Sequence, residues 1–528
     1  MNEAPRSLSR SIVSVGSGTA LSRILGFVRD ILMAYVIGTG PIADAFFAAF
    51  RFPNLFRHLF AEGAFNSAFI PLFAKSLEQR GDAQARAFAR LVLSWLILVL
   101  VIITVLAEVF MEPLTAVFVP GFRDDPEKFE LTVLLTRICF PYLACMSLTA
   151  AYGGILNGLR YFLAAAFAPV LLNAVLIVVL GAWIVWLETG TRDAAIALAW
   201  SVILGGILQL AIVAWGLQRA GHLPGLVWPR LSPDVARFWA LALPAVLTGG
   251  ITQINIFIGT IIASQSPSAI SYLYYADRLY QLPLGIVGIA IGVVLLPELS
   301  RHLKGNRQTE AAAAQDQSLF IALLLTLPAT IGLIVIAEPI IRVLFERGAF
   351  DVVATENTAR ALVAFGAGLP AFVLIKIFQP GYFAREDTRT PTVFAAISVV
   401  ANIALSIAFF PRLQHVGIAL ATSISAWLNV ALLVFFLARR GHFTPTAPQL
   451  RAYANLVIAA TVMAFVLIFA GIPADFYLLP GSPLLSQIIA LGVLILLGAA
   501  AYFLVVHLTG ARRMDRLVAA IRGKPPAA

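Results

Sequence analysis

The hydrophobic pattern divides nearly the whole chain into long apolar stretches joined by short polar segments. A helix that crosses a bilayer needs about 20 mostly apolar residues, and fourteen stretches of this kind follow one another along the sequence. The pattern therefore predicts an all-α polytopic membrane protein with fourteen transmembrane helices. These lie near residues 10–38, 42–74, 90–111, 131–156, 161–186, 194–216, 238–262, 271–297, 317–337, 357–381, 390–411, 415–438, 452–471 and 484–508.

Two places depart from a simple series of straight spans. The second stretch is too long for one span, and we expect a bend or break at Pro53 or Gly63, because proline removes a helical hydrogen bond. The longest loop is expected near residues 112–130. No loop is long enough to form a soluble catalytic domain.

Composition agrees with the membrane interpretation. Hydrophobic residues make up 60% of the chain and charged residues 12%, whereas a soluble domain has roughly 25% charged residues. The mean hydropathy of +0.90 excludes a water-soluble enzyme of this length. Residues 1–9 are short and polar and the first apolar stretch carries charges, so we expect no cleavable signal peptide.

Basic residues lie mainly in the segments that share a side with the two termini. They cluster at 75–90, 301–307, 439–451 and 512–524, and the loops 38–42, 263–270 and 471–483 on the opposite side have none. This asymmetry predicts that both termini are cytoplasmic, which requires an even number of helices. The net charge of +10 then reflects topology, and nucleic-acid binding is not needed to explain it.

A repeat divides the chain. Pro141 precedes Asn173 by the same 32 residues that separate Pro370 from Asn402. We therefore predict two pseudosymmetric six-helix lobes, residues 1–220 and 221–440, followed by two C-terminal helices and a basic cytoplasmic tail in residues 441–528. Transporters built from such repeats bind substrate between them. Chance similarity between apolar segments remains the alternative.

Charged residues inside the apolar stretches are the main candidates for function. A charge at the bilayer centre costs about 2.5–3.5 kcal/mol, so such residues must line water, pair with each other or reach the interface. Arginine presents a planar fork that matches phosphate and carboxylate oxygens. The basic residues are Arg23, Arg29, Arg51, Arg57, Arg137, Arg278, Arg360 and Lys376, and the acidic ones are Asp30, Asp44, Glu62 and Asp277.

We interpret Arg23, Arg29, Arg57 and Arg278 as substrate-binding residues in a water-filled cavity. Simple salt bridging is the alternative for each, and Arg51 is equally compatible with both roles. For the remaining basic residues in the spans we favour snorkelling or structural pairing. Three amides, on Gln253, Asn255 and Gln379, are candidates for a coupling-cation site, although ordinary interhelical hydrogen bonds are favoured.

Familiar catalytic motifs are missing from the sequence. It has no G-x-x-x-x-G-K-[ST] loop, no H-E-x-x-H and no C-x-x-C. We therefore predict a transporter with no catalytic residues, metal or cofactor, driven by the membrane potential or an ion gradient. A membrane-embedded enzyme that acts on polyprenyl phosphates and a scaffold that transports nothing are the alternatives from other classes.

Five short motifs occur together in this chain. They are Ser22–Asp30, Ala43–Phe47, Phe52–Arg57, Phe60–Phe65 and Tyr274–Leu279. Together they resemble the MurJ/MviN lipid II flippases of the multidrug/oligosaccharidyl-lipid/polysaccharide exporter superfamily. The resemblance implies fourteen helices, two lobes and a C-terminal helix pair whose groove holds the lipid tail. It also implies flipping of the undecaprenyl-diphosphate-linked peptidoglycan precursor across the bacterial inner membrane, from the cytoplasmic to the periplasmic leaflet.

By this resemblance the same four arginines contact the diphosphate and sugar, and the acids at positions 30, 44 and 62 are functionally sensitive. Position 51 is an arginine where a lysine is expected, and position 281 is a glutamine where an acid is expected, which puts an ion pair from that turn in doubt. The implied partners are lipid II, membrane lipids and the cell-wall synthesis machinery. An exporter of drugs or of another polyprenyl-linked saccharide is the alternative within the superfamily.

Overall fold

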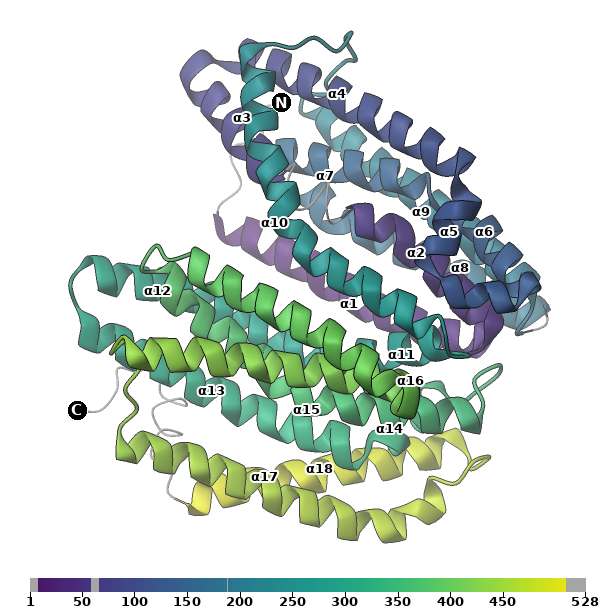
Figure 1. Cartoon of the computed structure of the whole chain (residues 1–528), viewed down its shortest axis with the longest axis vertical. Helices are drawn as coiled ribbons and strands as arrows, with labels where there is room; N and C mark the ends of the chain where they lie inside the picture. The colour runs from purple at the N-terminus through teal and green to yellow at the C-terminus, as the bar shows by residue number, and fades with distance from the viewer. Residues whose placement is uncertain (1–7, 58–65, 188, 510–528) are drawn as a thin grey trace. The chain divides into compact units, whose positions relative to one another are not determined.

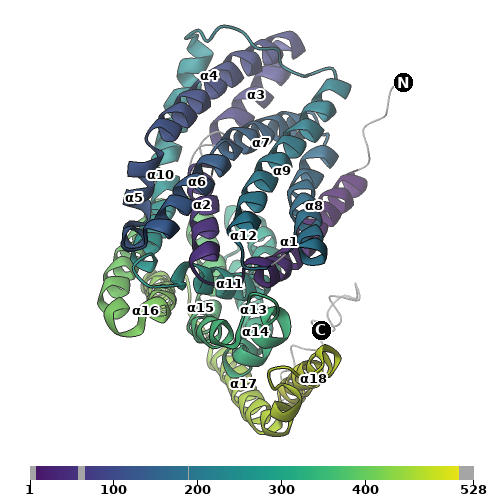
Figure 2. The ribbon, with the colours of Figure 1, turned by 90° about the vertical axis from the view of Figure 1, so that its right-hand side faces the viewer.

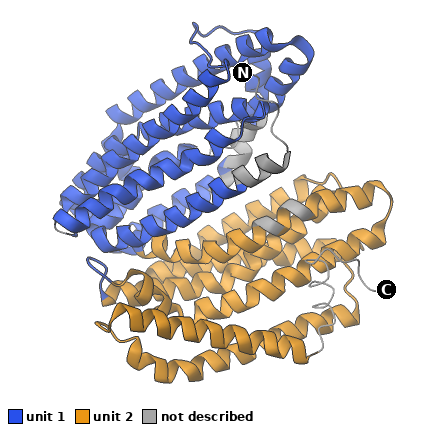
Figure 3. Ribbon diagram, turned by 180° about the vertical axis from the view of Figure 1, so that it is seen from behind, with its two compact units in different colours: residues 1–271, 347–351 blue, residues 272–346, 352–528 orange. Residues whose placement is uncertain are grey.

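The computed structural model describes residues 8–57, 66–187 and 189–509, and within these ranges the chain is helical with no strand. It forms two compact units, shown in Figure 3. The first comprises Met1–Ser271 with the short segment Arg347–Asp351, and the second comprises Tyr272–Glu346 with Val352–Ala528. The lobes predicted from the repeat rest on internal similarity rather than on contacts, and their boundaries stay a prediction.

The first unit is a bundle in which α1 lies along α8, and α8 along α9 (Figures 1 and 2). Its last long helix, α10, packs against α3 and α4. The elements are α1 (Leu8–Ile37), α2 (Pro41–Arg57), α3 (Asn66–Arg80), α4 (Asp82–Val109), α5 (Met111–Phe118), η2 (Pro120–Asp124), α6 (Pro126–Cys139), α7 (Tyr142–Gly158), α8 (Leu163–Trp186), α9 (Arg192–Arg219) and α10 (Pro233–Ala263).

In the second unit α15 packs against both α13 and α16. The elements are α11 (Ala269–Pro283), the π-helical turn η3 (Leu284–Gly288), α12 (Ile289–Lys304), α13 (Gln308–Val335), α14 (Ala337–Phe345), α15 (Val352–Phe383), α16 (Arg389–Arg439), α17 (Ala447–Ala474), η4 (Asp475–Tyr477) and α18 (Leu484–Leu508). The first three residues of α11 belong to the first unit, so this helix begins in one unit and continues in the other.

The helices α17 and α18 lie side by side and pack on α13 (Figure 1). Buried Leu456, Met463 and Leu467 of α17 meet Leu494 and Tyr502 of α18 in one apolar cluster that also includes Phe320 of α13. The C-terminal helix pair is therefore part of the second unit's core.

Nine segments of the described chain are long and apolar enough to cross a membrane. They include α4, α8, α9, α13, α15 and the C-terminal pair, which confirms a multi-pass membrane protein. Three helices outside this set, α1, α2 and α11, carry the predicted site residues. α1 contains several charges, and α2 and α11 have only 17 and 15 residues.

Three features of the fold bear on the expected element boundaries. Pro53 does not break a helix, since α2 continues through it to Arg57, and Gly63 lies outside the described residues. The loop expected at 112–130 is wrong: α5, η2 and the start of α6 fill it, because its proline residues sit at or near helix starts. The 51-residue α16 is interrupted at Gln414 (φ 48°, ψ −130°), between the stretches expected at 390–411 and 415–438.

Candidate functional site

The middle of α1 approaches α8 closely because α1 presents glycine at the contact. A Cβ atom on Gly18 would lie 2.8 Å from the carbonyl oxygen of Ala166, and one on Gly26 would lie 3.6 Å from Nδ2 of Asn173. Small residues of this kind let two helix backbones come together within a membrane. The approach brings polar side chains of the two helices into hydrogen-bonding range.

Arg29 and Asp30 form the polar centre of this contact. Nη2 of Arg29 lies 2.7 Å from Oδ1 of Asp30, and Nη1 donates to Oδ1 of Asn173 at 2.9 Å. The side chains of the ion pair are only 9% and 4% exposed. The other end of the Asn173 amide donates to the carbonyl oxygen of Ser22 at 3.0 Å. A buried arginine is thus held in a fixed orientation by an acid on its own helix and an amide on the next.

Arg23 lies on the same helix as this cluster but is exposed. It is seven residues before Asp30 and therefore shares its side of α1, whereas Arg29 points about a third of a turn away. Although Asp30 is buried, Arg23 is not, so the two arginines of α1 are in different environments. Arg29 is buried and paired, and Arg23 is the accessible one.

On α2 the two arginines differ in their partners. Nη1 of Arg51 donates to Oγ1 of Thr260 on α10 at 3.1 Å. Nε of Arg57 donates to Oδ1 of Asn54, one turn earlier, at 3.0 Å. Both side chains are partly buried. Arg51 therefore joins two helices, and the bond between Arg57 and Asn54 lies within α2.

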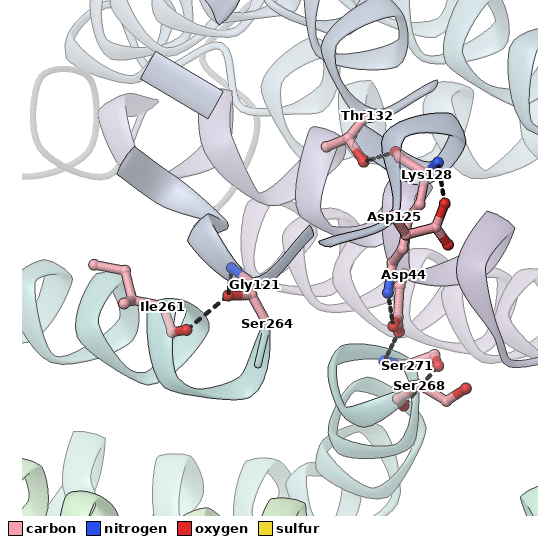
Figure 4. A network of polar contacts seen from close by, with 9 residues as sticks. All are labelled: Asp44, Gly121, Asp125, Lys128, Thr132, Ile261, Ser264, Ser268 and Ser271. Atoms are coloured by element: carbon pink, nitrogen blue, oxygen red, sulfur yellow. Dashed lines mark hydrogen bonds and ion pairs between the residues drawn. The ribbon is translucent and has the colours of Figure 1, made fainter. Parts of the chain in front are cut away.

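Asp44, in the first turn of α2, is fully buried. Its Oδ2 lies 2.8 Å from Nζ of Lys128 on α6, and its Oδ1 accepts the backbone N–H of Ser271 in the first turn of α11 at 2.9 Å (Figure 4). The acid predicted to support function is therefore the centre of a buried junction between helix starts.

The sequence-predicted residues Asp277 and Arg278 belong to α11 and to the second unit. The guanidinium of Arg278 lies over the ring of Tyr274, with Cζ 4.8 Å from the ring centroid, and Nη2 donates to the Tyr274 hydroxyl at 3.3 Å. Nε2 of Gln281 donates to Oδ2 of Asp277. The glutamine thus serves as a neutral donor to Asp277 where the resemblance led us to expect an acid.

The remaining sequence candidates are dispersed. Arg137, Arg360 and Lys376 are exposed, and Gln253, Asn255 and Gln379 are half-buried. Across the described ranges, no group of three or more His, Cys, Asp or Glu side chains has the arrangement of a metal site. Glu62, which was named from the sequence, lies outside the described residues.

Sequence reasoning missed two contributors to these contacts. In the sequence Asn173 only marks the repeat, and Lys128 falls in the segment 112–130, where the pattern predicts a loop. The sequence does contain a signal for Lys128, because Asp125-Pro126 is typical of a helix start. Oδ1 of Asp125 accepts the N–H of Lys128 at 3.1 Å. Recognising that start would have placed a lysine in the first turn of a helix.

The chain is a multi-pass membrane protein whose fold is similar to that of solved MOP superfamily transporters. A multidrug resistance MATE family transporter of that superfamily, solved in an inward-facing conformation, matches 81% of this chain and 98% of its own with a TM-score of 0.64. At 16% sequence identity this match shows the fold alone. The chain belongs to the lipid II flippase MurJ family, whose model matches residues 33–486.

Relatives and a solved structure agree with this assignment. The probable lipid II flippase MurJ of Rhizobium tropici is 48% identical over 522 residues, which cover 99% of this chain and 98% of the relative. Lipid II flippase MurJ of Burkholderia cenocepacia is 35% identical, with 94% and 96% of the two chains covered. A lipid II flippase MurJ in an inward closed conformation matches 93% of this chain and 99% of its own, with TM-score 0.75 and 27% identity.

Proposed function

We propose that this protein flips lipid II, the undecaprenyl-diphosphate-linked disaccharide-pentapeptide, from the cytoplasmic to the periplasmic leaflet of a bacterial inner membrane. Membership of the lipid II flippase family along almost the whole chain supports the proposal. The observation that carries it is the distribution of charge. α1, α2 and α11 hold the arginines Arg23, Arg29, Arg57 and Arg278, while nine other segments of the described chain are long and apolar enough to cross a membrane.

In this proposal the arginines bind the diphosphate and the adjoining sugar in a cavity open to one side of the membrane at a time. Arginine keeps its charge and donates in pairs to phosphate oxygens. The exposed Arg23 suits first contact with the headgroup. Arg29 is held by Asp30 and Asn173, so its guanidinium is already oriented before substrate arrives, which reduces the entropy lost on binding.

The proposed architecture has fourteen transmembrane helices in two pseudosymmetric six-helix lobes, with both termini cytoplasmic. The break at Gln414 supports counting α16 as two spans. The lobes alternate in exposing the headgroup site, as in other repeat-built transporters. The lipid tail stays in the bilayer along α17 and α18, whose outward faces carry large apolar side chains such as Phe465, Phe469 and Leu496.

The proposed energy source is the membrane potential or an ion gradient. Moving one unit charge through 100 mV changes the free energy by about 2.3 kcal/mol. Net movement of one charge across the membrane in each transport cycle is therefore enough to favour one direction of the cycle. The amides of Gln253, Asn255 and Gln379 remain candidates for a coupling-cation site. Collapse of the potential with valinomycin and potassium, or of a sodium gradient with monensin, distinguishes the two sources in proteoliposomes.

Rescue of cells depleted of their own lipid II flippase tests the function. The unaltered chain should restore growth, and Arg23→Ala and Arg278→Ala should not, although both proteins should still be present in the membrane. Loss of one charge-assisted contact to phosphate weakens binding by about 10- to 100-fold. Arg360→Ala is the matched control, because Arg360 is exposed on α15 with a surface acid, Glu356, 4.0 Å away.

The results separate the alternatives. Failure of the unaltered chain to rescue growth, despite normal amounts in the membrane, would contradict the proposed substrate. Rescue by both arginine variants at the level of the Arg360 control would contradict arginine binding of the headgroup. Recovery of chemically unchanged lipid II in the opposite leaflet of proteoliposomes excludes the embedded-enzyme alternative.

A further inference from the structure

Three helix starts meet at one buried carboxylate, that of Asp44. The carboxylate lies in the first turn of α2, and it contacts the first turn of α6 through Lys128 and the first turn of α11 through Ser271 (Figure 4). Lys128 is 8% exposed and the other two residues are fully buried. The three helices are far apart in sequence, so this junction is made by tertiary structure alone.

Lys128 occupies a position that its own helix does not favour. The start of a helix carries partial positive charge, which disfavours a cation there, and burial removes the ammonium from water. The ammonium compensates with the Asp44 carboxylate at 2.8 Å and with the ring of Phe122, whose centroid is 3.7 Å away. The Lys128 ammonium therefore serves to neutralise and orient the Asp44 carboxylate, and it does not stabilise the start of α6.

Asp44 in turn supplies the cap that α11 lacks locally. A helix usually has its third N–H satisfied by the side chain of its own N-cap residue. Here the residue before α11, Ser268, has φ 58°, and the N–H of Ser271 donates instead to Oδ1 of Asp44 at 2.9 Å. The carboxylate also places negative charge at the positive end of the helix. The start of α11 is thus fixed from α2.

A second contact fixes the connection between α10 and α11. The backbone N–H of Gly121 in η2 donates to Oγ of Ser264 at 3.1 Å, and that hydroxyl donates to the carbonyl oxygen of Ile261 at 2.7 Å (Figure 4). A Cβ atom at position 121 would come within 2.3 Å of the Ser264 carbonyl oxygen. The connection between α10 and α11 is therefore held closely against the segment that leads into α6.

We propose that Lys128 is a positioning residue for substrate binding. It orients Asp44, Asp44 fixes the first turn of α11, and that helix carries Arg278 seven residues beyond Ser271. Seven residues are two helical turns, about 10 Å along one face, so displacement of the helix start is transmitted to the arginine. This proposal rests on the role given to Arg278 in the proposed function.

Two double variants separate the effect of the charges at this junction from the effect of the hydrogen bond between Asp44 and Ser271. Lys128→Met leaves Asp44 as a buried carboxylate without its ammonium. Adding Asp44→Asn removes that charge and keeps an oxygen for the N–H of Ser271, whereas adding Asp44→Leu removes the oxygen as well. The two double variants have the same charge and differ in the cap.

A thiol at position 271 reports directly on the helix start. Cys139 and Cys145 are both free thiols, so they are first replaced by alanine, and Ser271→Cys is then introduced. Ser271 is fully buried, and the substitution keeps its backbone N–H. The reaction rate with N-ethylmaleimide in detergent measures how often the first turn opens, and lipid II flipping is measured in proteoliposomes.

We expect the Asp44→Leu double variant and Lys128→Met to react at least about tenfold faster than the unaltered protein and to flip lipid II correspondingly more slowly. The Asp44→Asn double variant should recover both properties relative to Lys128→Met. If Lys128→Met does not accumulate in the membrane, the thiol rates and flipping rates of the two double variants are compared with each other, and this comparison tests the proposal. Arg440→Met, which breaks an exposed ion pair with Asp387 elsewhere, is the control and should leave the thiol rate unchanged.

Equal thiol rates in the two double variants would overturn the capping role of Asp44. A faster thiol reaction with unchanged flipping would overturn the positioning role. The thiol rate does not depend on transport, so normal flipping by Arg278→Ala would contradict the role given to Arg278 while leaving the thiol result interpretable.

Discussion

Oδ1 of Asn173 accepts a hydrogen bond from Nη1 of Arg29 at 2.9 Å, across 144 residues of sequence. Because Nδ2 of the same side chain donates to the carbonyl oxygen of Ser22 at 3.0 Å, one amide on α8 contacts two turns of α1. A single uncharged residue thereby determines both how the helices meet and where a buried guanidinium points.

Removal of this amide should destabilise the first unit. Asn173→Ala deletes the acceptor of a charge-assisted hydrogen bond, which contributes about 1.5–3 kcal/mol, and we expect a lower thermal unfolding midpoint in detergent. Ser22→Ala should change it little, since the shorter bond from Asn173 goes to the Ser22 carbonyl and the hydroxyl lies 3.4 Å away. An unaltered midpoint for Asn173→Ala would contradict the structural role given to the amide.

Two glycines on α1 provide a matched test of the close approach to α8. Alanine is a better helix former than glycine by about 0.5–1 kcal/mol, and Gly16→Ala should stabilise the protein because no atom lies within 4 Å of the added carbon. Gly18→Ala adds the same group 2.8 Å from the Ala166 carbonyl oxygen and should destabilise by about 1–3 kcal/mol. Unfolding midpoints that move in the same direction would disprove the contact.

The ring of Tyr274 should matter more than its hydroxyl. A cation over an aromatic ring gains about 0.5–2 kcal/mol, and the ring orients Arg278 at 4.8 Å. We expect Tyr274→Phe to retain most lipid II flipping and Tyr274→Leu to raise the substrate concentration needed for half-maximal rate. Equal effects of the two substitutions would assign the role to the 3.3 Å hydrogen bond instead.

The contribution of Asp387, in the loop between α15 and α16, to the stability of the folded protein should depend on pH. The Arg440 guanidinium and the N–H of Thr390 lower the pKa of the Asp387 carboxyl from 3.8 to about 2. This carboxyl binds its proton more weakly in the folded state, so its ionised form stabilises the fold fully when the pH is above the unfolded-state pKa. The stabilisation is lost as the pH falls through the folded-state pKa. The stabilisation should thus be present at pH 5 and decline between about pH 4 and 2.

This dependence is measured by following the unfolding midpoint from pH 5 to 2.5 for the unaltered protein and for Asp387→Asn. The difference between the two midpoints should shrink as the pH falls. The pair is partly exposed, with side-chain exposures of 42% and 25%, and salt screens exposed ion pairs. A difference that stays constant with pH would show that ionisation of the Asp387 carboxyl does not contribute to folding.

Elements and contacts were not equally predictable from the sequence. The position of α18 agrees with the expected stretch at 484–508 because a long apolar run has few other structures in a membrane. The short α5 was missed because eight residues carry too little periodicity to distinguish a helix from a loop.

Side-chain partners were harder still. Asp44 and Lys128 are 84 residues apart and meet only because α2 and α6 pack together. Arg29 was identified as chemically important, but its burial against Asn173 depends on which helix packs against α1, and the sequence of α1 does not specify that partner. The residue types were therefore visible in the sequence, while their environments depended on tertiary packing.

The wide sequence separation between Arg29 and Asn173 also has a consequence for biogenesis. During synthesis at about 5–20 residues per second, the 144 residues between them take about 7–29 s to add. For that time α1, with its buried arginine and acid, exists without its amide partner on α8. Since each charge in the bilayer centre costs about 2.5–3.5 kcal/mol, α1 should remain at the insertion machinery or the membrane surface and settle into the bundle only after α8 emerges.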